Sequence, residues 1–182
     1  LSDWRYLIRP KLWIPTVAVY TIGYVASASV IDVYYFLGVV VAMLMTTASI
    51  VYNHYKDYDS DKKSKTVYRF PVASDKISKR AAKILSVLTV ATALLISGLF
   101  FRKNVFYLTA LGVFWLWSYS TLPIRAKTRP LLGLLWNGVG YGTLPFFLGL
   151  LINGGSINIP IVLLSLIPFC VVTSGHVLLQ VR

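Results

Sequence analysis

The chain has 182 residues, of which 57% are hydrophobic and 13% are charged, and its formal net charge at pH 7 is +12. A mean hydropathy of +0.69 excludes an ordinary soluble domain, because so few charged side chains cannot cover a water-exposed surface. The positive charge does not indicate nucleic-acid binding, because it is spread over the connections between apolar runs.

Uncharged runs of the length that a membrane-spanning helix needs, about 20 residues, recur along the chain. They predict six helices, over roughly 12–31, 34–56, 79–101, 104–122, 130–152 and 159–181. The last two are separated by the turn-forming residues 153–158, NGGSIN. No segment alternates polar and apolar positions as a membrane β-barrel strand would. The predicted fold class is therefore all-α, a polytopic transmembrane helical bundle.

The distribution of basic residues predicts the orientation of this bundle. With the N-terminus in the cytoplasm, every Lys and Arg except Arg102 and Lys103 falls on the cytoplasmic side, as the positive-inside rule requires. We therefore expect a multi-pass protein of the cell membrane, in contact with anionic membrane lipids and not with nucleic acid. The single cysteine, Cys170, lies inside the sixth predicted helix, where we expect a buried, inert thiol.

Three acidic residues, Asp57, Asp59 and Asp61, gather directly after the second predicted span, in the stretch NHYKDYDSDKK. If the helix continues through residue 61, Asn53, Asp57 and Asp61 fall at positions i, i+4 and i+8 along one edge. Carboxylates one turn apart repel each other unless a cation lies between them. Mg²⁺ prefers oxygen ligands of this kind, so Asn53, Asp57 and Asp61 are candidate metal ligands.

Basic residues flank this acidic stretch, among them Lys65 and Arg69. Such side chains neutralise phosphate groups, and Mg²⁺ is usually held by one or two carboxylates together with phosphate oxygens of a substrate. The pattern predicts a metal-diphosphate site that faces a membrane cavity. The alternative is a set of solvated carboxylates in a polar linker.

Four motifs follow one another in a characteristic order: NxxxDxxxD at 53–61, RFPVASDKIS at 69–78, YSTLPIRAKTRPLLG at 119–133 and NGVGYG at 137–142. In this order and spacing the chain resembles the UbiA superfamily of intramembrane prenyltransferases. One departure lies in the second motif, where Phe70 separates Arg69 from Pro71 although the family commonly has Arg-Pro.

The resemblance implies a polar site under a cytoplasmic cap and a hydrophobic chamber open to the bilayer. It also implies Mg²⁺-dependent transfer of an isoprenoid chain from a prenyl diphosphate to a lipophilic acceptor, such as a quinone precursor or an archaeal glycerol-phosphate lipid. Residues that match the family's functional positions are Asp57, Asp61 and Tyr119 as catalytic residues, Asn53, Lys65, Arg69 and Asn137 as substrate-binding residues, and Asn53, Asp57 and Asp61 as metal ligands.

Members of this family have about nine spans and a second aspartate-rich motif after the sixth span. We therefore expect residues 1–182 to form a single transmembrane prenyltransferase domain that is incomplete at its C-terminal end and inactive alone. The oligomeric state stays open.

Two other function classes remain open. A transporter or channel with a cation site at its cytoplasmic mouth is one, although no ionisable residue lies in the middle of a predicted span. A non-enzymatic assembly subunit is the other. A CDP-alcohol phosphotransferase is not expected, because its DGxxAR run is absent.

Overall fold

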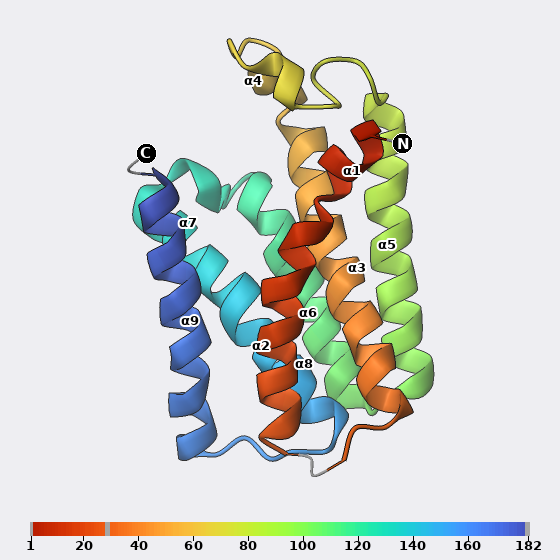
Figure 1. Cartoon of the computed structure of the whole chain (residues 1–182), viewed down its shortest axis with the longest axis vertical. Helices are drawn as coiled ribbons and strands as arrows, with labels where there is room; N and C mark the ends of the chain where they lie inside the picture. Colours follow the sequence, from red (N-terminus) through yellow and green to blue (C-terminus); the bar gives the residue numbers. More distant parts are fainter. Residues whose placement is uncertain (1, 28–29, 181–182) are drawn as a thin grey trace.

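The computed structural model describes residues 2–27 and 30–180, and every regular element in these ranges is helical. The long helices run along one axis as a bundle: α2 (Trp13–Val25), α3 (Val33–Lys56), α5 (Lys79–Phe100), α6 (Lys103–Ser120) and α9 (Ile159–Gln180) (Figure 1). Short elements gather at the end that carries α4: α1 (Ser2–Ile8), the 3₁₀ turns Pro10–Leu12, Val67–Arg69 and Ala126–Thr128, and α4 itself (Tyr58–Asp61). The predicted all-α class is confirmed.

Three helical segments of the described chain are long and apolar enough to cross a membrane by themselves. These are α3, α5 and the segment Pro130–Ile152, while the shorter apolar segment Ile159–Gly175 lies within α9. Helix α2 has 13 residues, which gives a length of about 20 Å, less than the hydrocarbon core of about 30 Å. Six helical segments thus follow the predicted ranges, but the prediction of six spans stays a prediction.

The first long helix ends earlier than the sequence predicts, at Val25 instead of residue 31. The Ser27 hydroxyl donates hydrogen bonds to the carbonyls of Tyr24 and Leu150, both at 3.1 Å. The Asn153 side-chain amide in turn donates to the carbonyl of Ser27 at 2.9 Å. The chain is thereby tied to the end of α8, which a count of apolar residues could not reveal.

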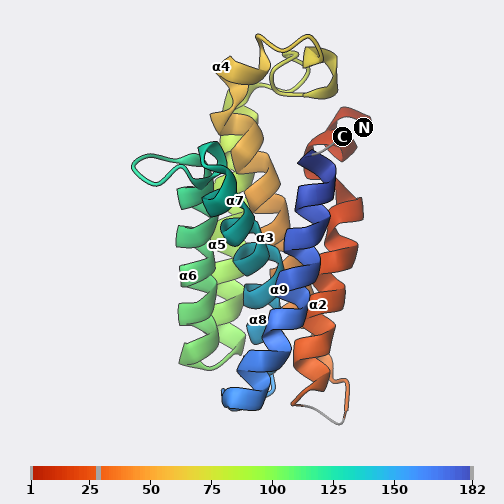
Figure 2. The same cartoon turned by 90° about the vertical axis from the view of Figure 1, so that its left-hand side faces the viewer.

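The segment Pro130–Ile152 is one broken helix, formed by α7 (Pro130–Asn137), a π-helix (Gly138–Thr143) and α8 (Leu144–Ile152). Pro145 has no amide hydrogen to donate to Tyr141, and the preceding amide, that of Leu144, reaches back five residues to the Val139 carbonyl. Figure 2 shows α7 and α8 between α6 on one side and α9 on the other. The π-helix packs against α9, and α8 packs against α2.

Two apolar clusters hold the bundle around the site. One joins α2, α3, α5, α6 and α8 through Tyr20, Tyr24, Val41, Ala42, Ala93, Val105, Leu148 and Leu151. The other, Leu7, Val51, Val72, Ile77 and Ala82, fastens α1 and the loop before α5 onto α3 and α5. This second cluster fixes the loop 62–78 close to the C-terminal end of α3, where the acidic residues lie.

Much of the outer surface is apolar, which suits a chain surrounded by lipid. Helix α9 exposes Leu163, Ile167 and Val171, and Cys170 is exposed on the same helix. The expectation of a buried thiol is therefore wrong. A cysteine in an apolar run can face lipid as readily as the protein interior, and hydropathy does not distinguish the two.

Candidate functional site

A cavity of about 590 Å³ opens inside the bundle, between α2, α3, α6, the broken helix and α9. Its polar end lies at α4, where the wall includes Arg9, Asn53, His54, Asp57 and Asp61. The rest of the wall is largely apolar and includes Leu12, Pro15, Val41, Ala42, Met45, Ile50, Leu108, Leu116, Leu144, Pro145 and Leu148. The cavity thus has a charged mouth and a largely apolar interior, called the chamber below.

Asn53, Asp57 and Asp61 all line this polar end, as their spacing predicts. Helix α3 ends at Lys56, but the Asp57 amide still bonds to the Asn53 carbonyl and the Asp61 amide to the Asp57 carbonyl, both at 2.8 Å. The i to i−4 pattern therefore continues into α4 and keeps the three side chains on one side. Their roles as metal ligands stay a prediction.

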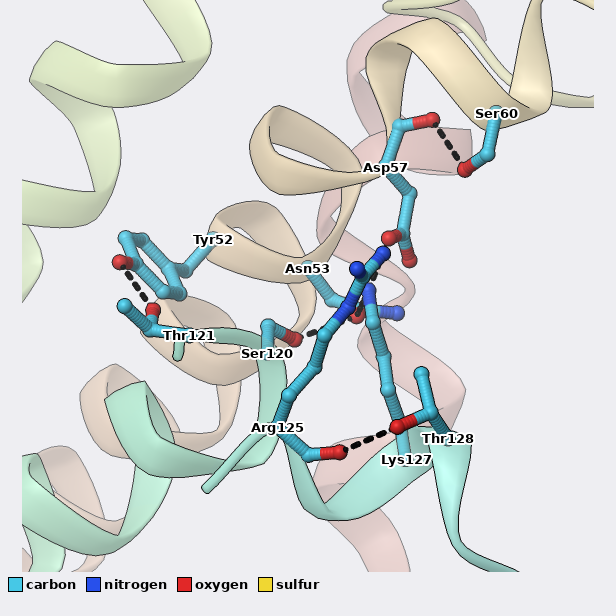
Figure 3. Close-up of polar contacts among 9 residues, drawn as sticks. All are labelled: Tyr52, Asn53, Asp57, Ser60, Ser120, Thr121, Arg125, Lys127 and Thr128. Atoms are coloured by element: carbon cyan, nitrogen blue, oxygen red, sulfur yellow. Dashed lines mark hydrogen bonds and ion pairs between the residues drawn. The ribbon is translucent and has the colours of Figure 1, made fainter. Parts of the chain in front are cut away.

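Lys127 reaches the same place from the loop after α6, and sequence reasoning did not select it (Figure 3). Its ammonium forms an ion pair with the Asp57 carboxylate and lies 3.4 Å from Asn53 Oδ1. The side chains of Lys127 and Asp57 are only 14% and 16% exposed. The structure thus places the positively charged ammonium of Lys127 between two of the predicted ligands.

Ser120 fixes the amide of Asn53, because its hydroxyl donates to Asn53 Oδ1 at 2.7 Å. Figure 3 shows that Ser120 and Lys127 approach Asn53 from the end of α6 and the following loop. Both belong to the motif YSTLPIRAKTRPLLG, which was the available signal. From that motif, however, the sequence reasoning chose only Tyr119.

The charged groups at this mouth shift the pKa of Asp61. Burial raises the pKa of its carboxyl group, the neighbouring Asp57 raises it further, and Lys127 and Arg9 act in the opposite direction. A partly desolvated carboxylate beside another carboxylate is an electrostatic cost that a bound divalent cation would remove.

Tyr119 and Asn137 meet on the cavity wall, as the family pattern implies. The Asn137 side-chain amide donates to Tyr119 Oη at 3.4 Å, and one turn further along the broken helix Tyr141 donates to Ser49 Oγ at 3.0 Å. All four side chains line the cavity. Asn137 ends α7 and Tyr141 lies in the π-helix, so the irregular turn brings both polar groups to the chamber.

Two tryptophans, Trp115 and Trp136, form a flat part of the wall. Their rings stack with centroids 4.0 Å apart at 10°, and each indole N–H donates to the backbone carbonyl of the other residue, at 2.9 and 3.1 Å. The pair joins α6 to α7. Its hydrogen-bonding groups are satisfied within the wall, so its aromatic surface is what it offers to the chamber.

Lys65 and Arg69 lie elsewhere. Both are exposed in the loop between α4 and α5, and neither is among the described residues that line the cavity. Phe70, the residue next to Arg69, lines the cavity instead, and its ring centroid lies 6.0 Å from that of His54. This agrees with the inserted phenylalanine that separates Arg69 from Pro71.

The loop itself is tied down by Asp75. Its carboxylate accepts hydrogen bonds from Tyr58 at 2.8 Å and from Lys62 at 3.0 Å, and these bonds lower the pKa of Asp75. Asp75 has a φ of 59°, in the left-handed region that favours glycine.

The donor set fits magnesium. Within residues 2–27 and 30–180 no group of three His, Cys, Asp or Glu side chains could hold a metal ion, so the candidate set is two carboxylates and an amide. Mg²⁺ keeps several waters and is completed by substrate phosphates, which such a small set of hard oxygen donors allows. The ammonium of Lys127 beside Asn53 and Asp57 shows that a cation suits this position.

The profile of the UbiA prenyltransferase family matches residues 12–181. This chain belongs to the UbiA prenyltransferase family. Together with its long apolar helices, membership identifies an integral membrane protein.

Two curated relatives of this UbiA chain are protoheme IX farnesyltransferases 1 and 2 of Pyrobaculum aerophilum. Each is 27% identical over 166 residues, which cover 91% of this chain. The matched part is 58% of each relative, so the chain spans less than two thirds of their length.

Solved structures share the fold. A UbiA homolog from Archaeoglobus fulgidus bound to DMAPP and Mg²⁺ superposes with a TM-score of 0.80 at 20% identity, over 96% of this chain and 61% of that one. The same homolog bound to GPP and Mg²⁺ gives 0.80 at 21% identity. A digeranylgeranylglyceryl phosphate synthase gives 0.80 at 23% identity, over 95% of this chain and 60% of that one.

Proposed function

We propose that the protein transfers an isoprenoid chain from a prenyl diphosphate to a lipophilic acceptor inside the membrane, in a Mg²⁺-dependent reaction. One observation carries the proposal: Asn53, Asp57, Asp61 and the Lys127 ammonium meet at the polar mouth of an otherwise apolar chamber. A diphosphate with a long hydrocarbon tail has the same two-part chemistry. The relatives' names and the ligands of the A. fulgidus homolog support this substrate class.

Asn53, Asp57 and Asp61 are the residues that would hold Mg²⁺. Bound there, Mg²⁺ would offset the charge that develops on a departing diphosphate. Lys127 is placed to contact the same diphosphate, since its ammonium already lies at this mouth. We assign Lys65 and Arg69, which are exposed on the loop between α4 and α5, to attracting the diphosphate as it approaches the mouth.

The chamber walls would protect and position the prenyl group. Its apolar lining excludes water, which would otherwise capture an allylic cation. The stacked face of Trp115 and Trp136 and the ring of Tyr119 offer π-electrons to such a cation. Asn137 holds the Tyr119 hydroxyl, and we assign it to positioning the substrate.

We assign the acceptor only to a class. A quinone precursor or an archaeal glycerol-phosphate lipid fits a chamber that is apolar below and cationic at its mouth, and the relatives' names add tetrapyrroles to this class. The proposed topology has six spans with the N-terminus and the mouth in the cytoplasm of the cell. It is supported by the connection between α5 and α6, which carries Arg102 and Lys103: this connection lies at the end of the bundle opposite α4 (Figure 1).

The test is Mg²⁺-dependent binding of geranyl diphosphate to the detergent-solubilised chain, because this chain spans about 60% of its relatives and binding does not require turnover. Asp57→Ala and Asp61→Ala should each abolish the Mg²⁺-dependent part of binding and leave the helical circular dichroism unchanged. Asp59→Ala is the matched control, since Asp59 is 82% exposed and pairs with Lys79 instead. Equal Mg²⁺-dependent binding by all three variants would refute the site.

A further inference from the structure

Helices α3 and α6 pack against each other in matching register, and both contribute residues to the chamber wall. At the mouth, Ser120 of α6 is hydrogen-bonded to Asn53 of α3. Eight residues deeper on each helix, a Cβ added to Gly112 would lie 3.2 Å from Met45 Cε. Both residues line the cavity. Eight residues of α-helix correspond to about 12 Å, so this close approach lies about 12 Å below Asn53.

The chamber continues beyond this level by one more turn. Val41 of α3 and Leu108 of α6 also line the cavity, each four residues deeper than Met45 and Gly112. Val41 belongs to the buried cluster of the bundle, and Leu108 packs against that cluster. The wall from Asn53 to Val41 therefore extends for about 18 Å along α3.

These depths correspond to numbers of isoprene units. Each unit contributes four main-chain bonds, which at about 1.5 Å per bond and tetrahedral geometry advance an extended chain by about 5 Å. A geranyl group therefore ends near the level of Gly112 and Met45. A farnesyl group has to pass beside the contact of Met45 with Gly112 to reach Val41 and Leu108, and a geranylgeranyl group reaches the far end of this wall.

We propose that Gly112, together with Met45, sets the prenyl chain length that the chamber accepts, and that in the wild type Met45 rests against the bare glycine and leaves a path beside it for farnesyl and geranylgeranyl chains. This inference rests on the proposed function. Gly112 presents no side chain to the chamber. Apart from its chain neighbours and the nearby backbone of its own helix, Met45 Cε is the one described atom within 4 Å of an added Cβ. A larger residue at 112 would therefore push the end of Met45 off the glycine and into the path of the chain.

The experiment compares Mg²⁺-dependent binding of dimethylallyl, geranyl, farnesyl and geranylgeranyl diphosphate to wild type and Gly112→Leu. We expect the variant to bind the two short diphosphates as wild type does, and to lose about tenfold or more in affinity for the two long ones, since lost space in an apolar pocket discriminates on this scale. Gly98→Leu is the matched control, because Gly98 is exposed on α5 outside the cavity and an added Cβ meets only the Phe106 ring there, at 3.4 Å.

Two further variants keep the test decisive. Gly112→Ala requires only a small shift of the flexible Met45 end, and it should weaken geranylgeranyl diphosphate alone if the leucine variant does not fold. Adding Met45→Ala to Gly112→Leu should restore part of the binding of long chains.

The outcomes separate the two proposals. A uniform loss for all four diphosphates, or an unchanged profile, would overturn the assignment of Gly112 while the prenyl-diphosphate site stands. Absence of Mg²⁺-dependent binding of every diphosphate to wild type would overturn the proposed function, and the inference with it.

Discussion

At the scale of single residues, the Asp57 carboxylate has two possible cationic partners, the Lys127 ammonium and a divalent metal. The ion pair with Lys127 is only partly exposed, and Asn53 Oδ1 is 3.4 Å from the same ammonium. A metal held by Asn53, Asp57 and Asp61 would therefore compete with Lys127 for these oxygens. When a diphosphate is present, the ammonium can turn to it instead.

This competition makes a prediction for Lys127→Met. Without Mg²⁺ the variant should lose about 1–3 kcal/mol of stability, because a partly buried carboxylate is left without its partner. Added Mg²⁺ should then raise the unfolding temperature of the variant by more than that of wild type, since no ammonium opposes the metal. Thermal unfolding in detergent measures both effects.

The control is Arg129→Met, an exposed change in the same segment, which should behave as wild type. Equal Mg²⁺ shifts of the unfolding temperature in all three proteins would contradict a competition between Lys127 and the metal.

The sequence predicted one part of this residue cluster and missed another for a physical reason. Asn53, Asp57 and Asp61 are joined by local helical hydrogen bonds, so their common side follows from a spacing of four. The contact between Asp57 and Lys127 spans 70 residues, and it depends on how the loop after α6 packs against α3. No local period encodes such a contact.

At the scale of elements, the broken helix shapes the chamber. A Cβ added to Gly142 would lie 2.8 Å from the Pro168 carbonyl oxygen and 2.9 Å from Phe169 backbone atoms of α9. The glycine therefore allows the π-helix to touch the backbone of α9. The motif NGVGYG and the following Pro145 do not by themselves specify a π-helical turn, so this feature comes from the structure alone.

Gly142→Ala should accordingly destabilise the bundle by about 1–3 kcal/mol, because backbone atoms of α9 cannot move aside as a side chain would. Gly140→Ala is the matched control in the same π-helix, since its added Cβ would lie 3.4 Å from the Trp115 ring, an ordinary contact. Chemical or thermal unfolding of both variants in detergent measures the difference. A stability of Gly142→Ala equal to that of Gly140→Ala would show that the close contact does not matter.

Element boundaries were predictable where a cap or a charge marks them. Helix α3 begins after Asp32, whose carboxylate accepts from the Tyr35 amide, and α5 begins after Ser78, whose hydroxyl accepts from the Ala81 amide. Both starts lie within one residue of prediction. The end of α2 was missed because its determinants, Leu150 and Asn153, lie far along the chain.

At the scale of the whole molecule, charge and hydropathy predict an orientation in the membrane. The α4 end of the bundle carries the acidic site and the basic loops, while α5 and α6 connect at the opposite end (Figure 1). The exposed apolar surface between these ends was predictable as membrane-facing from composition. The chamber behind the acidic residues was expected as well, but most residues of its wall were not identified, because they come from helices far apart in sequence.

Cysteine labelling tests this orientation in sealed right-side-out vesicles, with Cys170→Ser as the background. Lys63→Cys should react with a membrane-impermeant maleimide only after the membrane is permeabilised, and Lys103→Cys should react without permeabilisation. Both lysines are exposed, Lys63 just after α4 and Lys103 at the start of α6, and Figure 1 shows these parts of the two helices at opposite ends of the bundle. Labelling of both from the same side would contradict a cytoplasmic mouth and N-terminus.

The central claim is that a divalent cation binds between Asn53, Asp57 and Asp61. It is tested most directly by the anomalous diffraction of Mn²⁺, an oxygen-preferring stand-in for Mg²⁺, in crystals grown with geranyl diphosphate. The account predicts an anomalous peak at coordination distance, about 2.2 Å, from carboxylate oxygens of Asp57 and Asp61, with the diphosphate beside it. A peak elsewhere, or an Asp57 still paired with Lys127 and no peak at the mouth, would contradict it.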